Sequence, residues 1–204
     1  MESLDGNTTY LEAARGRLIE ELREHALVIG EVTLTSGAKA QYYIDAKRAI
    51  LRPEGFAALG ALVAAQVQEW RGTAVGGMTM GADPVACAAL AGGAGAKAYF
   101  VRKDVKPHGL QRRIEGPPLS GEDRCVVVED VVTTGGSTLA AIEALHDAGH
   151  EICGVISVLD RLAGGGAAIE AAARAPYRAL STIDEVYPER PDRDGQASGI
   201  GTSA

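Results

Sequence analysis

The sequence predicts an α/β fold, with a mostly parallel central sheet flanked by helices and a small hood or hairpin region near the N-terminus. Short apolar runs rich in valine and isoleucine alternate with stretches of helical spacing, which is the pattern of βαβ units. The run at 125–128 has no polar alternation, which is typical of a strand buried on both faces. The 204 residues are 46% hydrophobic and 23% charged, a composition typical of a globular protein with a full core.

The N-terminal part of the chain predicts a helix followed by a hairpin. Apolar residues over 11–28 recur with helical spacing and without proline, which indicates a helix. Two short strand-like runs, at 32–34 and 42–44, flank the stretch TSGAKAQ and predict a β-hairpin.

The rest of the chain predicts the repeating units of the sheet. A helix starts at Pro53, because proline is favoured in the first helical turn, and reaches about Trp70. Residues 102–124 show no regular pattern. The other predicted strands are at 74–75, 98–101, 125–128, 152–159 and 177–180, and the other predicted helices are around 85–90, 138–146 and 167–173.

The chain is expected to form a single domain over residues 1–187. Within it, residues of about 10–50 supply the N-terminal helix and hairpin, and residues 51–187 supply the α/β core. The tail at 188–204 is rich in proline, glycine, serine and charge, so it is predicted to be disordered.

Charge and cysteine content exclude several classes of protein. The net charge of −7 gives no general reason to expect binding to nucleic acid or to a membrane surface. We find no apolar run of 18 residues and no signal region near the N-terminus. The three cysteines lie in apolar runs without a C-x₂₋₄-C pair, which favours reduced thiols in a cytoplasmic protein over disulfides or a metal site.

The stretch VVVEDVVTTGGS at 126–137 combines a phosphate-binding turn with two acids. The strand is expected to end at Glu129 and Asp130, at the edge of the sheet where ligands bind. The backbone N–H groups of the glycine turn and the hydroxyls of Thr133, Thr134 and Ser137 can surround a phosphate at a helix N-terminus. The patterns of a P-loop and of a dinucleotide site are both absent.

Ribose 5-phosphate satisfies both features of this stretch. The turn would bind the phosphate, while the acids would accept hydrogen bonds from the sugar hydroxyls and favour positive charge on the ring. The simpler alternative is a strand that ends in a solvated acidic turn and a capped helix.

A basic loop separates two of the predicted strands. Between Phe100 and Gly116, five basic residues against two acidic ones give +3, which leaves −10 for the rest of a chain whose net charge is −7. A connection of this length is usually functional or disordered. The loop therefore predicts a mobile lid that brings cations to a polyanionic ligand, and the alternative is a solvated surface loop.

These motifs resemble those of known enzymes. The strand, acids and T-T-G-x-S-T of the phosphate turn resemble the phosphoribosyl-diphosphate (PRPP) signature of the type I phosphoribosyltransferases. The order R-K-x-x-K-x-H-G and then I-E-G resembles the catalytic loop of orotate phosphoribosyltransferases. VTLTSGAKAQYYID, GGMTMGADPVA and the VLDR that ends at Arg161 resemble that family's substrate hairpin, diphosphate-side loop and orotate-side strand end. The resemblance covers about residues 18–187.

The resemblance implies the type I phosphoribosyltransferase fold and a pentosyl transfer in pyrimidine biosynthesis. Orotate and PRPP would give orotidine 5'-monophosphate and diphosphate, with Mg²⁺ bound mainly through PRPP rather than by a metal site of the protein. Lys103 would reach the site of the neighbouring subunit, which implies a homodimer that shares its lid loops.

The resemblance also implies a role for particular residues. Catalysis would involve Lys103, Glu129 and Asp130. Orotate would be bound by Thr133, Arg161 and the backbone near Tyr43 and Ile44. PRPP would be bound by Arg102, Lys103, Lys106, His108, Glu129, Asp130, Val131, Val132, Thr133, Thr134, Gly135, Gly136 and Ser137.

Two positions depart from the family's pattern. Many members have lysine where this chain has Thr35 and Met80, so the resemblance implies no role for these two residues. Two alternatives to orotate transfer are a transferase for a purine base and a non-catalytic regulator of the same fold that binds PRPP.

Overall fold

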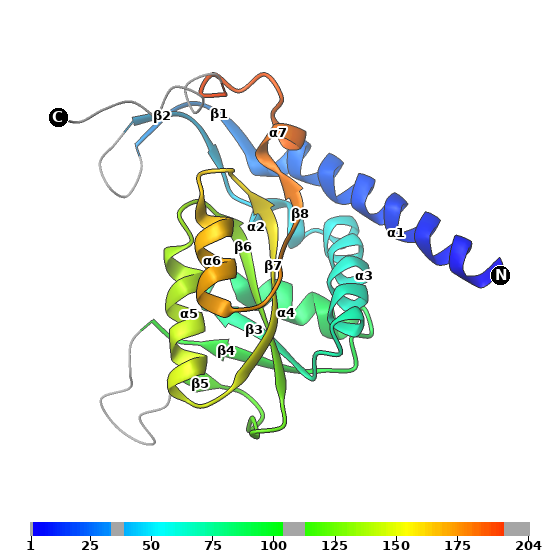
Figure 1. The fold of residues 1–204 in the computed structure, drawn as a ribbon. Coiled ribbons are helices and arrows are strands. Elements are labelled where there is room, and N and C mark those ends of the chain that lie inside the picture. The colour runs from blue at the N-terminus through cyan, green and yellow to red at the C-terminus, as the bar shows by residue number, and fades with distance from the viewer. Residues whose placement is uncertain (1, 34–38, 104–112, 194–204) are drawn as a thin grey trace.

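The computed structural model describes residues 2–33, 39–103 and 113–193, and a six-stranded sheet forms its centre (Figure 1). The strand order is β5-β4-β3-β6-β7-β8, and only the short edge strand β5 is antiparallel to its neighbour. The predicted mostly parallel sheet is therefore confirmed. Its strands are β3 (Ala74–Met78), β4 (Lys97–Val101), β5 (Ile114–Glu115), β6 (Arg124–Val132), β7 (Glu151–Asp160) and β8 (Tyr177–Thr182).

Helices cover both faces of the sheet and bury the central strands (Figure 1). On β6, Val126 and Val128 pack into the core cluster on one face, while Cys125 and Val127 pack into the cluster on the other. This two-sided burial explains why the run has no polar alternation. The first face carries α1 (Glu2–Glu21), α3 (Pro53–Glu69) and α4 (Ala82–Ala91), and the second carries α5 (Gly136–Asp147) and α6 (Gly165–Ala173).

The predicted N-terminal hairpin is present, but the helix before it ends earlier than predicted. A π-helix, η1 (Leu22–Ala26), follows α1, and the chain then enters β1 (Leu27–Thr33), which pairs antiparallel with β2 (Lys39–Ile44). Leu27 and Val28, which were expected to be helical, lie opposite Ile44 and Tyr43. The helical spacing of apolar residues does not reveal such strand pairing, because the partner strand lies many residues away in the sequence.

The strand that carries the two acids is longer than predicted. The predicted strand covers 125–128 and ends at Glu129 and Asp130, but β6 continues to Val132, because β7 pairs with it as far as that residue. The other neighbour, β3, pairs with β6 only as far as Val127. Beyond that point β7 continues beside the acids on one side, and on the other side the turn at Gly81 closely approaches Asp130.

The C-terminal residues of the described chain pack against the domain. After α7 (Ile183–Val186), the side chain of Arg190 is buried and makes ion pairs at 2.9 Å with both Asp184 and Asp192. The composition of residues 188–193 predicts solvated charges, whereas Arg190 forms ion pairs with Asp184 and Asp192. Disorder of the tail stays a prediction. The rest of the predicted tail lies outside the described residues.

None of the helices within residues 2–33, 39–103 and 113–193 is long and apolar enough to cross a membrane.

Candidate active site

Two adjacent acids on β6 lie buried at the carboxyl edge of the sheet. Glu129 and Asp130 are 5% and 9% exposed. One carboxylate oxygen of Glu129 accepts a hydrogen bond from the Thr138 hydroxyl at 3.1 Å. Burial, and after it the charge of Asp130, raise the pKa of Glu129 to about 8. Glu129 therefore keeps its proton to a higher pH than an exposed glutamate does.

A lysine outside the predicted motifs holds Asp130 in place. Lys47, the first residue of α2 (Lys47–Ile50), places its Nζ 3.1 Å from Oδ2 of Asp130 and 2.9 Å from Oδ1 of Asp45. Partial burial acts to lower the pKa of Lys47, but the hydrogen bonds and charges of these two carboxylates outweigh burial and raise it. The other Asp130 oxygen accepts the backbone N–H of Val131 at 2.8 Å. This part of the site is thus anchored before any substrate is bound.

The phosphate turn forms a hollow next to the acids. Residues from Glu129 to Thr138 line a cavity of about 270 Å³. Thr133, Thr134 and Ser137 are exposed there, as a site for a soluble phosphate requires. Gly135 caps the N-terminus of α5 with φ of 84°, and a Cβ at this position would lie 3.1 Å from the side chain of Ile169. Only glycine suits this turn, which directs the helix N-terminus at the cavity.

The turn before α4 also meets the acids. A Cβ on Gly81 would lie 2.5 Å from Oδ1 of Asp130, so the diphosphate-side loop predicted from GGMTMGADP contacts the predicted catalytic acid. Met80, where many relatives have lysine, is 69% exposed on this turn. Thr35, the other departure, lies outside the described residues.

The stem of the basic loop is fixed by backbone hydrogen bonds. The N–H of Arg102 donates to the carbonyl of Arg113 at 2.8 Å, and the Arg113 Nε donates back to the carbonyl of Arg102 at 3.3 Å. Lys103 follows as an exposed bend. The structure therefore places Arg102 and Lys103, the first two predicted cations, at the N-terminal end of the basic loop. The other two, Lys106 and His108, lie outside the described residues.

Arg161 begins the turn after β7 and lies beside the phosphate loop. Its backbone N–H donates to the carbonyl of Val132 at 2.8 Å. Its Nη2 donates to the hydroxyl of Tyr42 at 3.0 Å, and its Cζ lies 5.0 Å from the centre of the Tyr42 ring. Strand ends that are far apart in sequence are thus brought together around this guanidinium.

The hairpin residues alternate between core and surface. On β2, Tyr42 and Ile44 are almost fully buried, while Tyr43 is 39% exposed. The side chain of Ile44 therefore belongs to the core, and only its backbone remains available to a ligand. A role for the backbone at Tyr43 and Ile44 in binding orotate stays a prediction.

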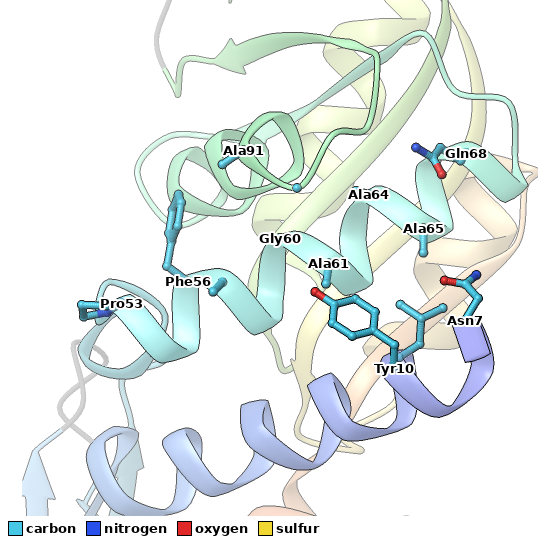
Figure 2. Close-up of a pocket in the computed structure, with 13 residues that line it drawn as sticks. Asn7, Tyr10, Pro53, Phe56, Gly60, Ala61, Ala64, Ala65, Gln68 and Ala91 are labelled. Carbon is cyan, nitrogen blue, oxygen red and sulfur yellow. The ribbon is translucent and has the colours of Figure 1, made fainter. Parts of the chain in front are cut away.

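One cavity larger than that beside the acids lies away from this chemistry. A cavity of about 550 Å³ between α1, α3 and α4 is lined mainly by small and apolar residues of α3, with Tyr10 and Asn7 on α1 (Figure 2). None of its lining residues is a carboxylate, a histidine or a basic side chain. Cavity volume is therefore a poor guide to the position of the active site, because the smaller cavity beside Glu129 is the one lined by reactive groups.

Known proteins similar to the chain identify its family. No model of a protein family matches the chain. An orotate phosphoribosyltransferase from Corynebacterium glutamicum (strain R) is 47% identical over 184 residues, which are 90% of this chain and 98% of that protein. The chain belongs to the orotate phosphoribosyltransferase family. The predicted family and its type I fold are thereby confirmed.

Solved structures of the orotate phosphoribosyltransferase family share the fold. The Mycobacterium tuberculosis enzyme in complex with Fe(III) dicitrate has a TM-score of 0.77 at 42% identity, covering 85% of this chain and 99% of that chain. The same enzyme in complex with PRPP has a TM-score of 0.73 at 38% identity, covering 85% of this chain and 98% of that chain.

Three residues that shape the site were not predicted from the motifs of the sequence. Lys47 holds Asp130, Tyr42 holds Arg161, and Asp192 accepts the Tyr42 hydroxyl. The sequence does carry a signal for the first, because the charged pair Asp45 and Lys47 directly follows the hairpin. Asp192 gives no local signal, since it lies in a segment whose composition predicts disorder.

Proposed function

We propose that this protein transfers the 5-phosphoribosyl group from PRPP to orotate, giving orotidine 5'-monophosphate and diphosphate in pyrimidine biosynthesis. The observation that carries the proposal is the buried Glu129–Asp130 pair beside the phosphate cavity, in a chain 47% identical to an orotate phosphoribosyltransferase. We also propose that the protein works in the cytoplasm.

The phosphate end of PRPP binds the turn from Val131 to Ser137. Backbone N–H groups at the start of α5 and the exposed hydroxyls of Thr133, Thr134 and Ser137 surround the 5-phosphate. Because Gly135 keeps this turn in a left-handed conformation, the donors are oriented before the ligand arrives.

The two acids, Glu129 and Asp130, contact the ribose of PRPP. Asp130 accepts hydrogen bonds from the ribose hydroxyls, and its charge stabilises the positive charge that develops on the ring as the C1–O bond loosens. Glu129, whose pKa is raised by burial, contributes polar contacts and has less tendency to place a second negative charge beside the phosphates. The ion pair with Lys47 holds Asp130 at its place on the strand.

The lid cations serve the leaving group. Arg102, Lys103, Lys106 and His108 neutralise the diphosphate, and closure of the lid excludes water that would hydrolyse PRPP. Among the described residues, no group of three histidine, cysteine or acidic side chains is arranged to hold a metal ion. Since Asp130 is already paired with Lys47, we propose that Mg²⁺ arrives bound to PRPP. When bound, Mg²⁺ would neutralise charge on the departing diphosphate.

Orotate lies on the Arg161 side of the site. The guanidinium pairs with a planar polar edge of the base, and Thr133 and the backbone near Tyr43 and Ile44 complete its pocket. A nitrogen of the base then attacks C1 of the ribose.

A panel of acceptor bases tests the proposed function. Purified protein with Mg²⁺ and PRPP should consume orotate and leave uracil, hypoxanthine and adenine unchanged. Consumption of hypoxanthine or adenine instead would identify a purine transferase. PRPP binding without consumption of any base would identify a regulator.

We further propose a homodimer in which Lys103 serves the neighbour's site. Lys103→Ala and Asp130→Asn chains, each nearly inactive, would be unfolded, mixed equally and refolded. If a two-fold dimer shares its loops, half the dimers are mixed and each has one intact site, so roughly a quarter of wild-type activity returns. Activity that stays at the level of the single variants, or a monomer by light scattering, would contradict the shared site.

A further inference from the structure

The C-terminal segment reaches the candidate orotate side of the site through one tyrosine. We name residues 187–192 the C-terminal brace. The Tyr42 hydroxyl accepts from Arg161 Nη2 at 3.0 Å and donates to Asp192, whose two carboxylate oxygens lie 3.0 and 3.2 Å away. Figure 1 shows the chain after α7 running beside the β1–β2 hairpin that carries Tyr42. Three segments distant in sequence therefore meet at one phenol oxygen.

The direction of these hydrogen bonds determines what each group can do. A phenol has a single proton, and an arginine has only donors. The Tyr42 oxygen can accept from Arg161 only while its own proton points elsewhere, and Asp192 supplies the acceptor for that proton. A charged acceptor also polarises the phenol, which strengthens its hydrogen bond with the guanidinium.

Asp192 is itself held firmly. Arg190, 5% exposed, donates to Asp192 and to Asp184 at 2.9 Å each. Burial acts to raise the pKa of Asp192, but hydrogen bonds from Arg190 and Tyr42 outweigh it and keep the pKa below its ordinary value, so Asp192 is ionised at neutral pH. The Tyr187 ring packs edge-on against the Tyr42 ring at 5.4 Å, which fixes the ring as well as its hydroxyl.

We propose that the C-terminal brace positions Arg161, through Tyr42, for the acceptor base, and thereby sets affinity for orotate and leaves affinity for PRPP unchanged. Tyr42, Asp192 and Arg190 are positioning residues, because they act through Arg161 and not on the substrate. Tyr42 is the only hydrogen-bond partner of the Arg161 side chain within the described residues, so its other donors remain for a ligand. An arginine fixed in advance loses less conformational freedom on binding, which strengthens binding.

This proposal rests on the proposed function, and the test separates the two. Tyr42→Phe removes the hydroxyl and keeps the packed ring. We expect it to raise KM for orotate about tenfold, because one charge-assisted hydrogen bond that orients Arg161 is lost, and to change KM for PRPP and kcat by less than about twofold. Asp192→Asn, which keeps one acceptor oxygen, should raise KM for orotate by a smaller factor.

Matched controls lie far from the site. Tyr10→Phe removes a hydroxyl from a tyrosine that is 61% exposed on α1, and Asp147→Asn neutralises an exposed aspartate at the end of α5. Neither should change KM for orotate or PRPP. Thermal unfolding of every variant reports whether an altered KM reflects lost structure.

A double-mutant cycle decides whether the brace acts through Arg161. In an Arg161→Ala background, Tyr42→Phe and Asp192→Asn should raise KM for orotate no further, because the group that they position is gone. Additive effects in that background, an unchanged KM for orotate in Tyr42→Phe, or equal increases for both substrates would each overturn the proposal. If Tyr42→Phe does not fold, the Asp192→Asn cycle gives the same decision. A wild-type protein that does not use orotate would refute the proposed function itself.

Discussion

The two halves of the proposed active site are built in different ways. The ribose-phosphate half comes from one continuous stretch, in which β6, the phosphate turn and the start of α5 bring together Glu129 to Ser137. The half proposed to bind orotate comes from three distant segments, which meet around Tyr42 through Arg161, Tyr187 and Asp192. A local half depends on backbone geometry, whereas a non-local half depends on how the whole domain folds.

This difference predicts where changes have their largest effect. A substitution in the continuous stretch acts directly on PRPP or on the backbone that holds it. A substitution in the assembled half acts on affinity for the base, through side chains that support one guanidinium.

The largest effect is expected for Asp130→Asn. Loss of the charge beside the ribose removes stabilisation that is greatest in the transition state, so kcat should fall by roughly a hundredfold or more. Steady-state kinetics at saturating orotate and PRPP measure this fall, and Asp147→Asn is the control for a neutralised aspartate elsewhere. A folded Asp130→Asn protein with near wild-type kcat would remove the acid from the mechanism.

The buried acid Glu129 predicts how stability depends on pH. Its folded pKa of about 8 lies above the ordinary value of 4.5, so its protonated form favours the folded state. That contribution is fully present below about pH 4.5 and is lost as pH rises through about 8. Glu129→Gln cannot ionise, so its stability relative to wild type should increase between pH 5 and 8, by on the order of a few kcal/mol.

Denaturant unfolding at several pH values measures that difference. Comparing the two proteins at each pH cancels titration of all other groups. A difference that does not change with pH would mean that Glu129 is already ionised at pH 5.

A smaller effect is expected for Gly135→Ala. Its φ of 84° disfavours any residue with a Cβ, and the added atom would lie close to Ile169. The free energy of unfolding should fall by about 1–2 kcal/mol, and KM for PRPP should rise because the turn is displaced. Gly121→Ala is the control, since a Cβ there meets nothing within 4 Å. Equal stability of the two variants would show that the turn tolerates an ordinary residue.

The same contrast explains how far the sequence could predict the structure. The succession of the main strands and helices along the chain, the phosphate turn and the acids were predictable, because each depends on residues that are neighbours in the sequence. The end of β6 was not, since its last residues are strand only because β7 pairs with them. The ion pairs of Arg190 were not predictable for a similar reason, because Arg190 meets Asp184 and Asp192 only once the chain has folded.

One pair of variants tests most directly whether a single site has these two separately built halves. Arg161→Ala should weaken apparent orotate affinity by about 1.5–3 kcal/mol and leave KM for PRPP nearly unchanged. Ser137→Ala, which removes a phosphate-turn hydroxyl, should raise KM for PRPP by a factor of about five and leave KM for orotate nearly unchanged. If Arg161→Ala weakens PRPP while orotate affinity is unchanged, or if both variants affect both substrates equally, the division of the site is wrong.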